Sequence, residues 1–212
     1  MTRKKSKRRK AYKTIFIACE GCREHEFLTY IKDLFYEELQ ERNIRIEIDD
    51  KKNNAFGGTP EKRLSTALKN ESKYNIVIAW LDDDVQIEDA RIYRRLEQSW
   101  CVGRISDNIS LDELKKLNIN NRNPIIILAQ PLSIESVIIR ILGKDIPNLD
   151  ESLSAKSKVN KLKNSLSGIF GFKDVDKEYQ YYLENLSKED LISRARNIEC
   201  LKKLFEILNI KL

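Results

Sequence analysis

Three short apolar runs, and one segment in which isoleucines alternate with charged residues, divide the first 150 residues of this 212-residue chain. Between the runs lie segments with apolar residues at every third or fourth position, as in Glu24–Gln40, which is the period of a helix. Strands that alternate with helices are typical of a parallel sheet with helices on both faces. We therefore expect an α/β fold with a parallel sheet of about four strands flanked by helices. The predicted strands are Thr14–Ala18, Ile44–Ile48, Asn75–Leu81 and Pro124–Ala129.

Local signals fix the ends of several predicted helices. Thr59 can cap a helix that starts at Pro60, because proline suits the first turn. Ser133 is expected to cap the helix after the fourth strand, and Gly143 to end it. A polar helix near Glu88–Glu97 and a short helix opened by the capping box Ser110–Glu113 complete the prediction.

The strand pattern stops near Lys144, and only helical periodicity continues to the end of the chain. Leu162 and Leu166 belong to one periodic stretch, and Leu191 to Leu208 form another. We expect three segments. They are a basic disordered tail over residues 1–13, an α/β domain over 14–147, and a helical extension over 148–212 that packs on the same domain.

The net charge of +6 is concentrated at the N-terminus. Residues 1–13 hold eight Lys or Arg and no acid, and the remaining chain holds 31 basic and 33 acidic residues. Such a tail attracts nucleic acid through counterion release, or only keeps the chain in solution. Other basic residues beside the predicted site can hold a phosphate backbone or form ordinary solvated surface. The candidate nucleic-acid contacts are Lys4, Lys5, Arg8, Arg9, Lys51, Lys52, Arg91, Arg94 and Arg95.

Several classes of protein are disfavoured by what the sequence lacks. No apolar run approaches the ~20 residues of a membrane span. The basic N-terminus is not followed by the apolar segment of a secretory signal. The four cysteines are read as free thiols, so a cytoplasmic location is expected. A single histidine argues against hydrolases that need several His ligands.

Acidic residues follow three of the predicted strands. Glu20 follows the first strand, Asp82-Asp83-Asp84 follows the third, and Glu135 lies just after the fourth. Ligands bind at the carboxyl ends of the strands in an open parallel sheet, so these acids are expected at one edge. An acid at a strand end can also cap the next helix, and Asp84 alone is open to that interpretation.

Grouped carboxylates favour a divalent cation, because each acid otherwise raises the pKa of its neighbours. Hard oxygen ligands suit Mg²⁺ or Mn²⁺, and such a cation polarises a phosphoryl group and activates a water. In an extended chain Asp82 and Asp84 point the same way and Asp83 points away. The expected metal ligands are Glu20, Asp82 and Asp84, and Glu135 completes the acidic edge.

Cysteine chemistry is the main rival at the first strand end. Cys19-x-x-Cys22 lies where a thioredoxin-like motif would lie, and a zinc site could add His25 and Cys101. Cys19 continues the apolar strand, however, and a glutamate between the two cysteines raises their pKa. Buried or half-buried free thiols are the favoured interpretation.

The motifs resemble a known domain. "IACEG" at the first strand end, "AWLDDD" at the third and "PLSIES" before an apolar helix look like a Toprim domain. Among Toprim proteins, the RloB-like (also AbiL-like) bacterial defence family is the nearest resemblance, over roughly Thr14 to Gly143. It implies a Toprim-like (Rossmann-like) sheet. It also implies a nuclease that acts in antiphage defence, with a regulatory partner such as a defence-system ATPase.

The resemblance also implies residue roles. Glu20 takes the place of the Toprim glutamate, a metal ligand or general acid-base, and Asp82 and Asp84 take that of the metal-binding DxD. Glu135 resembles the glutamate of the helix after the fourth strand. The stretch "EGCREHEF" is one residue shorter than the family pattern, so Glu24 and Glu26 compete for an accessory role. One extra residue also separates the proline of "PLSIES" from its glutamate.

The sequence thus predicts a Mg²⁺-dependent nuclease acting on RNA or DNA. One alternative is a non-catalytic protein with a Toprim-like fold that binds nucleic acid or a partner. Another is an enzyme that processes a small nucleotide. The choice between RNA and DNA and the presence of an oligomer are left open by the sequence.

Overall fold

The computed structural model describes residues 12–49, 60–82, 101–102, 125–129, 132–171 and 186–212. Its five strands form a parallel sheet in the order β2-β1-β3-β5-β4. The predicted α/β fold with a parallel sheet is confirmed, and the two-residue β4 adds an edge to the four predicted strands. The strands are β1 Lys13–Cys19, β2 Ile44–Ile48, β3 Ile76–Asp82, β4 Cys101–Val102 and β5 Ile125–Ala129.

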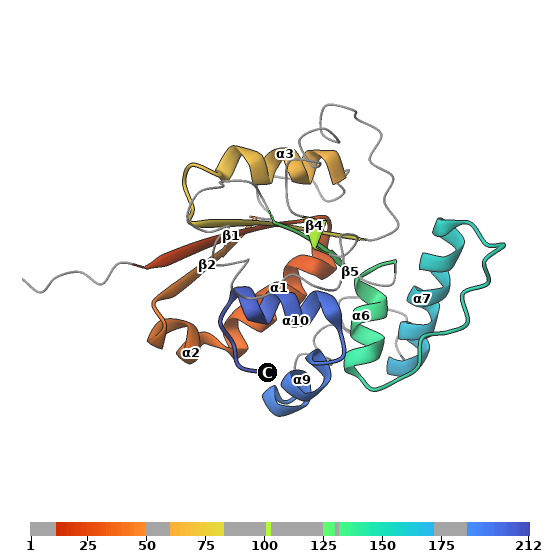
Figure 1. The fold of residues 1–212 in the computed structure, drawn as a ribbon. Coiled ribbons are helices and arrows are strands. Elements are labelled where there is room, and N and C mark those ends of the chain that lie inside the picture. Colours follow the sequence, from red (N-terminus) through yellow and green to blue (C-terminus); the bar gives the residue numbers. More distant parts are fainter. Residues whose placement is uncertain (1–11, 50–59, 83–100, 103–124, 130–131, 172–185) are drawn as a thin grey trace, which may run out of the picture.

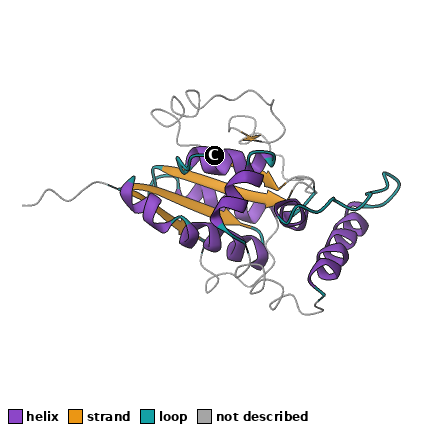
Figure 2. Ribbon diagram, turned by 90° about the horizontal axis from the view of Figure 1, so that it is seen from below, coloured by secondary structure: helices purple, strands orange, loops and turns teal. Residues whose placement is uncertain are grey.

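Helices cover both faces of the sheet. Figure 1 shows α3 above the strands and α1, α6 and α10 below them. In the view from below, Figure 2 shows these lower helices crossing the sheet and α7 standing to one side. The described helices are α1 Cys22–Leu34, α2 Tyr36–Glu41, α3 Pro60–Asn70, α6 Ile134–Ile141, α7 Ala155–Phe170, α9 Lys188–Ala195 and α10 Glu199–Ile207.

The central strands are continuously apolar because both of their faces are buried. Successive side chains of a strand point to opposite faces. Phe16 and Ala18 of β1 therefore pack toward Leu64 of α3, whereas Ile17 and Trp80 belong to the larger core on the other face. The sheet thus separates two apolar cores and holds the strand ends at fixed positions between them.

The segment predicted as one helix over Glu24–Gln40 is two helices. The chain leaves helical geometry at Phe35, with φ −104° and ψ 20°, and α2 then begins at Tyr36. Neither glycine nor proline marks this break. Phe35 is buried, and its ring packs edge-on against that of Phe205, with 5.2 Å between centroids. A contact with a distant helix therefore accompanies the break, which explains why local periodicity did not predict it.

The predicted end of α6 at Gly143 is confirmed. Gly143 has φ +70°, and its N–H donates to the carbonyl of Arg140, while the N–H of Lys144 donates to that of Ile139. This pair of bonds is a Schellman motif, which satisfies the last carbonyls of a helix. The predicted Thr59 cap and the predicted helices near 88–97 and 110–113 lie outside the described residues.

The C-terminal helices share the core of the sheet. α10 lies against β5, and both α7 and α9 lie against α6. Leu201 and Phe205 of α10 are fully buried in the same core as Trp80. Among the helices that the structure describes, none combines the length and apolar character needed to cross a membrane.

Candidate functional site

Two of the predicted acids meet where β1 and β3 end. The strands are neighbours in register, with Cys19 opposite Trp80, so their carboxyl ends lie side by side. An oxygen of the Glu20 carboxylate accepts a hydrogen bond from the backbone N–H of Asp82, at 2.8 Å. Both residues are half-buried. The expectation that separate segments bring Glu20 and Asp82 to one sheet edge is met in this geometry.

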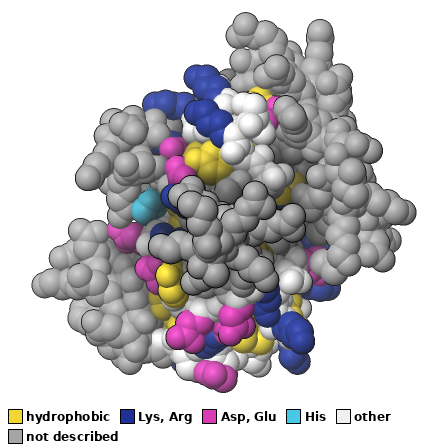
Figure 3. Space-filling model, turned by 90° about the vertical axis from the view of Figure 1, so that its left-hand side faces the viewer, with side chains coloured by type: hydrophobic (Ala, Val, Ile, Leu, Met, Phe, Trp, Pro, Cys, Tyr) yellow, Lys and Arg dark blue, Asp and Glu magenta, His cyan; other side chains and the backbone are white. Residues whose placement is uncertain are grey.

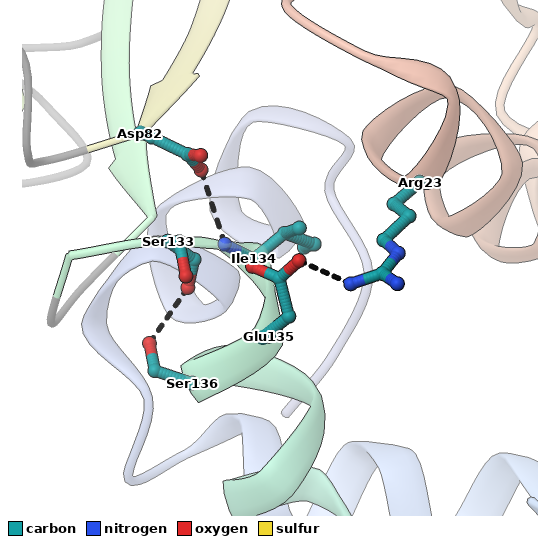
Figure 4. A network of polar contacts seen from close by, with 6 residues as sticks. All are labelled: Arg23, Asp82, Ser133, Ile134, Glu135 and Ser136. Atoms are coloured by element: carbon teal, nitrogen blue, oxygen red, sulfur yellow. Dashed lines mark hydrogen bonds and ion pairs between the residues drawn. The ribbon is translucent and has the colours of Figure 1, made fainter. Parts of the chain in front are cut away.

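Asp82 also holds the start of α6. Its Oδ1 accepts a hydrogen bond from the backbone N–H of Ile134 at 3.0 Å (Figure 4). The predicted cap, Ser133, occupies the N-cap position, but its side chain makes no cap bond. The Ser133 hydroxyl is buried and has no hydrogen-bond partner among the described residues. Asp82 therefore supplies the side-chain acceptor that the sequence assigned to Ser133.

Glu135 lies in the first turn of α6 and is almost completely buried, with 2% of its surface exposed. Its carboxylate forms an ion pair with the guanidinium of Arg23 in the first turn of α1 (Figure 4). A buried carboxylate needs such a partner, because an uncompensated charge is costly away from water. Sequence reasoning did not single out Arg23, because the contact spans 112 positions and leaves no local pattern.

Glu24 is buried in α1, with 5% exposed. Burial raises the pKa of its carboxyl group, hydrogen bonds from the backbone of Glu24 and Gly21 oppose the shift, and the charge of Glu135 raises it further. Glu24 occupies the third helical position, from which a glutamate reaches back to the N-cap backbone. Glu26 is half-buried on the same helix. Of these two competing acids, Glu24 lies within electrostatic reach of the predicted Glu135.

Gly21 is explained by the position of the Glu24 carboxylate. A Cβ atom at residue 21 would lie 2.7 Å from an oxygen of Glu24. The backbone of Gly21 is extended, with φ −133° and ψ −176°, so its conformation does not itself require glycine. The glycine after Glu20 therefore makes room for a second acid.

The thiol of Cys19 is unsuited to thiolate chemistry. Burial raises its pKa to about 12, and the charge of Glu24 adds to the shift. Cys19, Cys22 and Cys200 are free cysteines. Within the described ranges, no group of three or more His, Cys, Asp or Glu side chains is arranged to hold a metal ion. The cysteine zinc site is therefore not assembled in this part of the chain, and packing remains the interpretation for Cys19.

A further strand-end acid, Asp49, was not singled out from the sequence. It directly follows β2, and its backbone N–H donates to the carbonyl of Ile17 at 2.9 Å. The Asp49 carboxylate forms a 2.9 Å ion pair with buried Arg63 of α3. The signal that could have found it is the one used for Glu20 and Asp82, an acid immediately after an apolar strand.

The other predicted site residues fall outside the described residues. Asp84, the third predicted metal ligand, is one of them, so the described part of the chain contains two of the three. The predicted nucleic-acid contacts outside it are Lys4, Lys5, Arg8, Arg9, Lys51, Lys52, Arg91, Arg94 and Arg95.

Comparison with known proteins leaves the site to be interpreted from its own chemistry. No family model, no curated protein and no solved structure matches the chain. The Toprim resemblance therefore continues to rest on the three motifs and on the order in which they occur.

Proposed function

We propose that this chain is a metal-dependent nuclease that hydrolyses phosphodiester bonds of RNA or DNA. The observation that supports the proposal most is the meeting of Glu20 and Asp82 at the carboxyl edge of the sheet, joined by a 2.8 Å hydrogen bond. Glu24 and Glu135 lie in the first turns of α1 and α6, the helices that follow β1 and β5. Glu20 and Asp82 thus meet at the edge where open α/β sheets bind ligands, and Glu24 and Glu135 interact electrostatically, although no three of the described acids are grouped around one point.

The donor set fits Mg²⁺ or Mn²⁺, because carboxylate oxygens are hard ligands. Glu20 and Asp82 would hold the cation, together with Asp84 as the sequence predicts. When bound, such a cation polarises a phosphoryl oxygen and lowers the pKa of a water.

The residues of the chain then have distinct tasks. Asp82 is fixed by its bond to the N–H of Ile134, so its carboxylate is held at the edge. Arg23 forms an ion pair with Glu135 and holds its carboxylate in place. Glu20 is the candidate for proton transfer or metal binding. Glu24 retains its proton to higher pH than an exposed glutamate, which suits a general acid.

The biological setting is part of the same proposal. The RloB-like resemblance supports antiphage defence in the cytoplasm, with activity controlled by a regulatory protein such as a defence-system ATPase. The basic tail over residues 1–13 supplies a contact for nucleic acid.

A non-catalytic nucleic-acid- or partner-binding protein is the second candidate. Two observations favour it: Asp82 caps α6, and Glu135 is paired with Arg23, so both acids have structural roles. In this alternative the acids hold the strand ends together and carry out no reaction.

A cleavage panel separates the two candidates. The full chain is incubated with end-labelled tRNA, single-stranded RNA, and single- and double-stranded DNA, with Mn²⁺, Mg²⁺ or EDTA. We expect metal-dependent cleavage that falls at least about a hundredfold in Glu20→Gln and in Asp82→Asn. Asparagine retains an acceptor for Ile134, so loss of the α6 cap would not explain the second result. Glu37→Gln, on the exposed side of α2, is the matched control.

The same proteins are tested for metal binding. Added Mn²⁺ is expected to raise the melting temperature of the wild type, because a ligand of the native state stabilises it. Cleavage that persists in both site variants, or a wild type that neither binds metal nor cleaves any substrate, would exclude the nuclease and leave the binding protein.

A further inference from the structure

Helix α7 carries four lysines and no acid over its 16 residues. Lys156, Lys161 and Lys163 are exposed, and Lys158 is half-buried. No ion pair joins these lysines to an acid of the described residues. By contrast, Lys188 of α9 pairs with Glu38, and Lys203 of α10 lies 3.6 Å from each of two glutamates. The positive charge of α7 is therefore not neutralised by acids of the described residues, and it can interact with an anionic partner.

The placement of two of these lysines is unfavourable for the helix itself. Ser154 is the N-cap, and its side chain accepts a bond from the N–H of Ser157, so Lys156 and Lys158 lie in the first turn or just after it. The N-terminus of a helix carries partial positive charge, which disfavours nearby cations. Lys158 and Lys161 are also three positions apart, where like charges repel. An anion bound at this end would relieve both repulsions.

Asp150 is the acid near these lysines, and its carboxylate already accepts hydrogen bonds from Ser152. The pKa of Asp150 is lowered first by hydrogen bonds from the backbone and side chain of Ser152, and to a smaller extent by the charges of Lys161 and Lys158. Lys161 donates to the carbonyl of Asn148 at 2.6 Å. Three lysines, Lys156, Lys158 and Lys163, thus remain without a specific contact in the described structure.

The character of the exposed side limits which partner it fits. Leu162 and Leu166 face inward, where α7 packs on α6, so no apolar stripe is left to enter a membrane. By the helical period, Asn160 and Asn164 lie between the lysines on the outer side. A protein interface is built around buried aromatic and apolar residues, which this side lacks. Lysine and amide groups match the contacts that proteins make to phosphate and sugar.

We propose that the lysines of α7 bind the phosphate backbone of a nucleic acid. The inference rests on the nucleic-acid part of the proposed function, and it holds for a nuclease and for a binding protein alike. α7 packs on α6, and α6 begins beside Asp82, so the helix lies next to the element that carries the acidic edge (Figure 1). A strand held by α7 would be anchored beside the candidate site.

The test measures binding by the full chain in EDTA, so that its outcome does not depend on cleavage. Fluorescein-labelled single-stranded RNA and DNA are titrated at several salt concentrations with wild type and with Lys156→Gln/Lys158→Gln/Lys163→Gln. We expect weaker binding in the variant. The slope of log K against log salt is expected to become shallower by about 2, since each phosphate contact to a single strand contributes roughly 0.7.

Two further variants control for fold and for bulk charge. The corresponding triple Lys→Arg variant keeps the charge and is expected to bind like the wild type. Lys69→Gln/Lys73→Gln removes exposed lysines at and beyond the end of α3 and is expected to leave the slope unchanged. Figure 3 shows basic side chains on another face too, interspersed with acidic ones, so a general charge effect needs this comparison.

The proposal is overturned if the Lys→Gln variant binds both nucleic acids with unchanged affinity and salt slope. It is also overturned if the variant instead loses binding to vesicles of anionic phospholipid or to polyglutamate while nucleic-acid binding persists. If only the nuclease proposal fails, the result is different. The wild type then binds nucleic acid in EDTA through the α7 lysines but does not cleave it when Mg²⁺ or Mn²⁺ is added.

Discussion

Asp82 connects three parts of the molecule through one residue. Its backbone N–H donates to Glu20 at the end of β1, and its carboxylate accepts from the N–H of Ile134 at the start of α6. The residue at the N-cap position, Ser133, has a buried hydroxyl for which the described part of the chain offers no hydrogen-bond partner. The cap of α6 is therefore a tertiary contact, and the Asp82 side chain provides its contribution to the free energy of unfolding.

This division of roles predicts opposite effects for two substitutions. Asp82→Ala is expected to lower the free energy of unfolding by about 1 kcal/mol, the usual cost of losing a helix cap. Ser133→Ala is expected to leave it unchanged or to raise it, because the removed hydroxyl is buried and unbonded. Urea denaturation of the metal-free proteins measures both. A loss in Ser133→Ala as large as that in Asp82→Ala would show that the serine is the cap.

Glu24 predicts a pH dependence of stability. Its folded pKa is raised, chiefly by burial, so the native state holds the proton at pH values where the unfolded chain has released it. The contribution of Glu24 to the free energy of unfolding is fully present below the pKa that the group has in the unfolded chain. It is lost as the pH rises through the pKa that the group has in the folded protein. Glu24→Gln removes the titration and is expected to raise the melting temperature at pH 7 more than at pH 4, in EDTA.

The matched control is Glu37→Gln on the exposed side of α2, which is expected to change the melting temperature little at either pH. A Glu24→Gln protein that is destabilised equally at both values would mean that the hydrogen bonds of the carboxylate outweigh its burial.

At the scale of elements, the junction between β1 and α1 depends on a close approach. A Cβ atom at residue 21 would lie 2.7 Å from the Glu24 carboxylate, which is buried and bonded to the helix start. Gly21→Ala is therefore expected to cost about 1–3 kcal/mol of unfolding free energy, as overpacking does elsewhere. In a background of Glu24→Ala the same substitution is expected to cost much less. A double-mutant cycle followed by urea denaturation measures this coupling. If the two changes in unfolding free energy are additive, the cost of Gly21→Ala does not arise from contact with the Glu24 carboxylate.

The elements themselves were largely predictable, whereas their contacts were not. Runs such as "IFIAC" identify strands buried on both faces, and Gly143 identifies the end of α6, because these signals are local. The break at Phe35, the Arg23–Glu135 pair and the Asp49–Arg63 pair depend on segments that meet only in the fold. Glu20 and Asp82 could be placed together because parallel strands fix their carboxyl ends at one edge.

At the scale of the whole molecule, the C-terminal helices and the sheet share one apolar core. Phe205 of α10 is fully buried and packs against Phe35 at the boundary between α1 and α2, and Leu201 lies in the same core as Trp80. α10 packs directly on β5 of the sheet. The acidic edge is therefore supported from below by residues that follow it by more than 60 positions in the chain.

This shared core predicts that the sheet and the C-terminal helices unfold together. Phe205→Ala is expected to lower the free energy of unfolding by about 3–5 kcal/mol, because it leaves a cavity among residues of both parts. Circular dichroism and tryptophan fluorescence are expected to report the same lowered urea midpoint, since Trp80 lies in the core that Phe205 completes. Ser193→Ala, at an exposed position of α9, is the control. If the fluorescence midpoint stayed at the wild-type value while helical signal was lost earlier, the C-terminal helices would be a separate folding unit, and the strand ends that carry Glu20 and Asp82 would be stable without them.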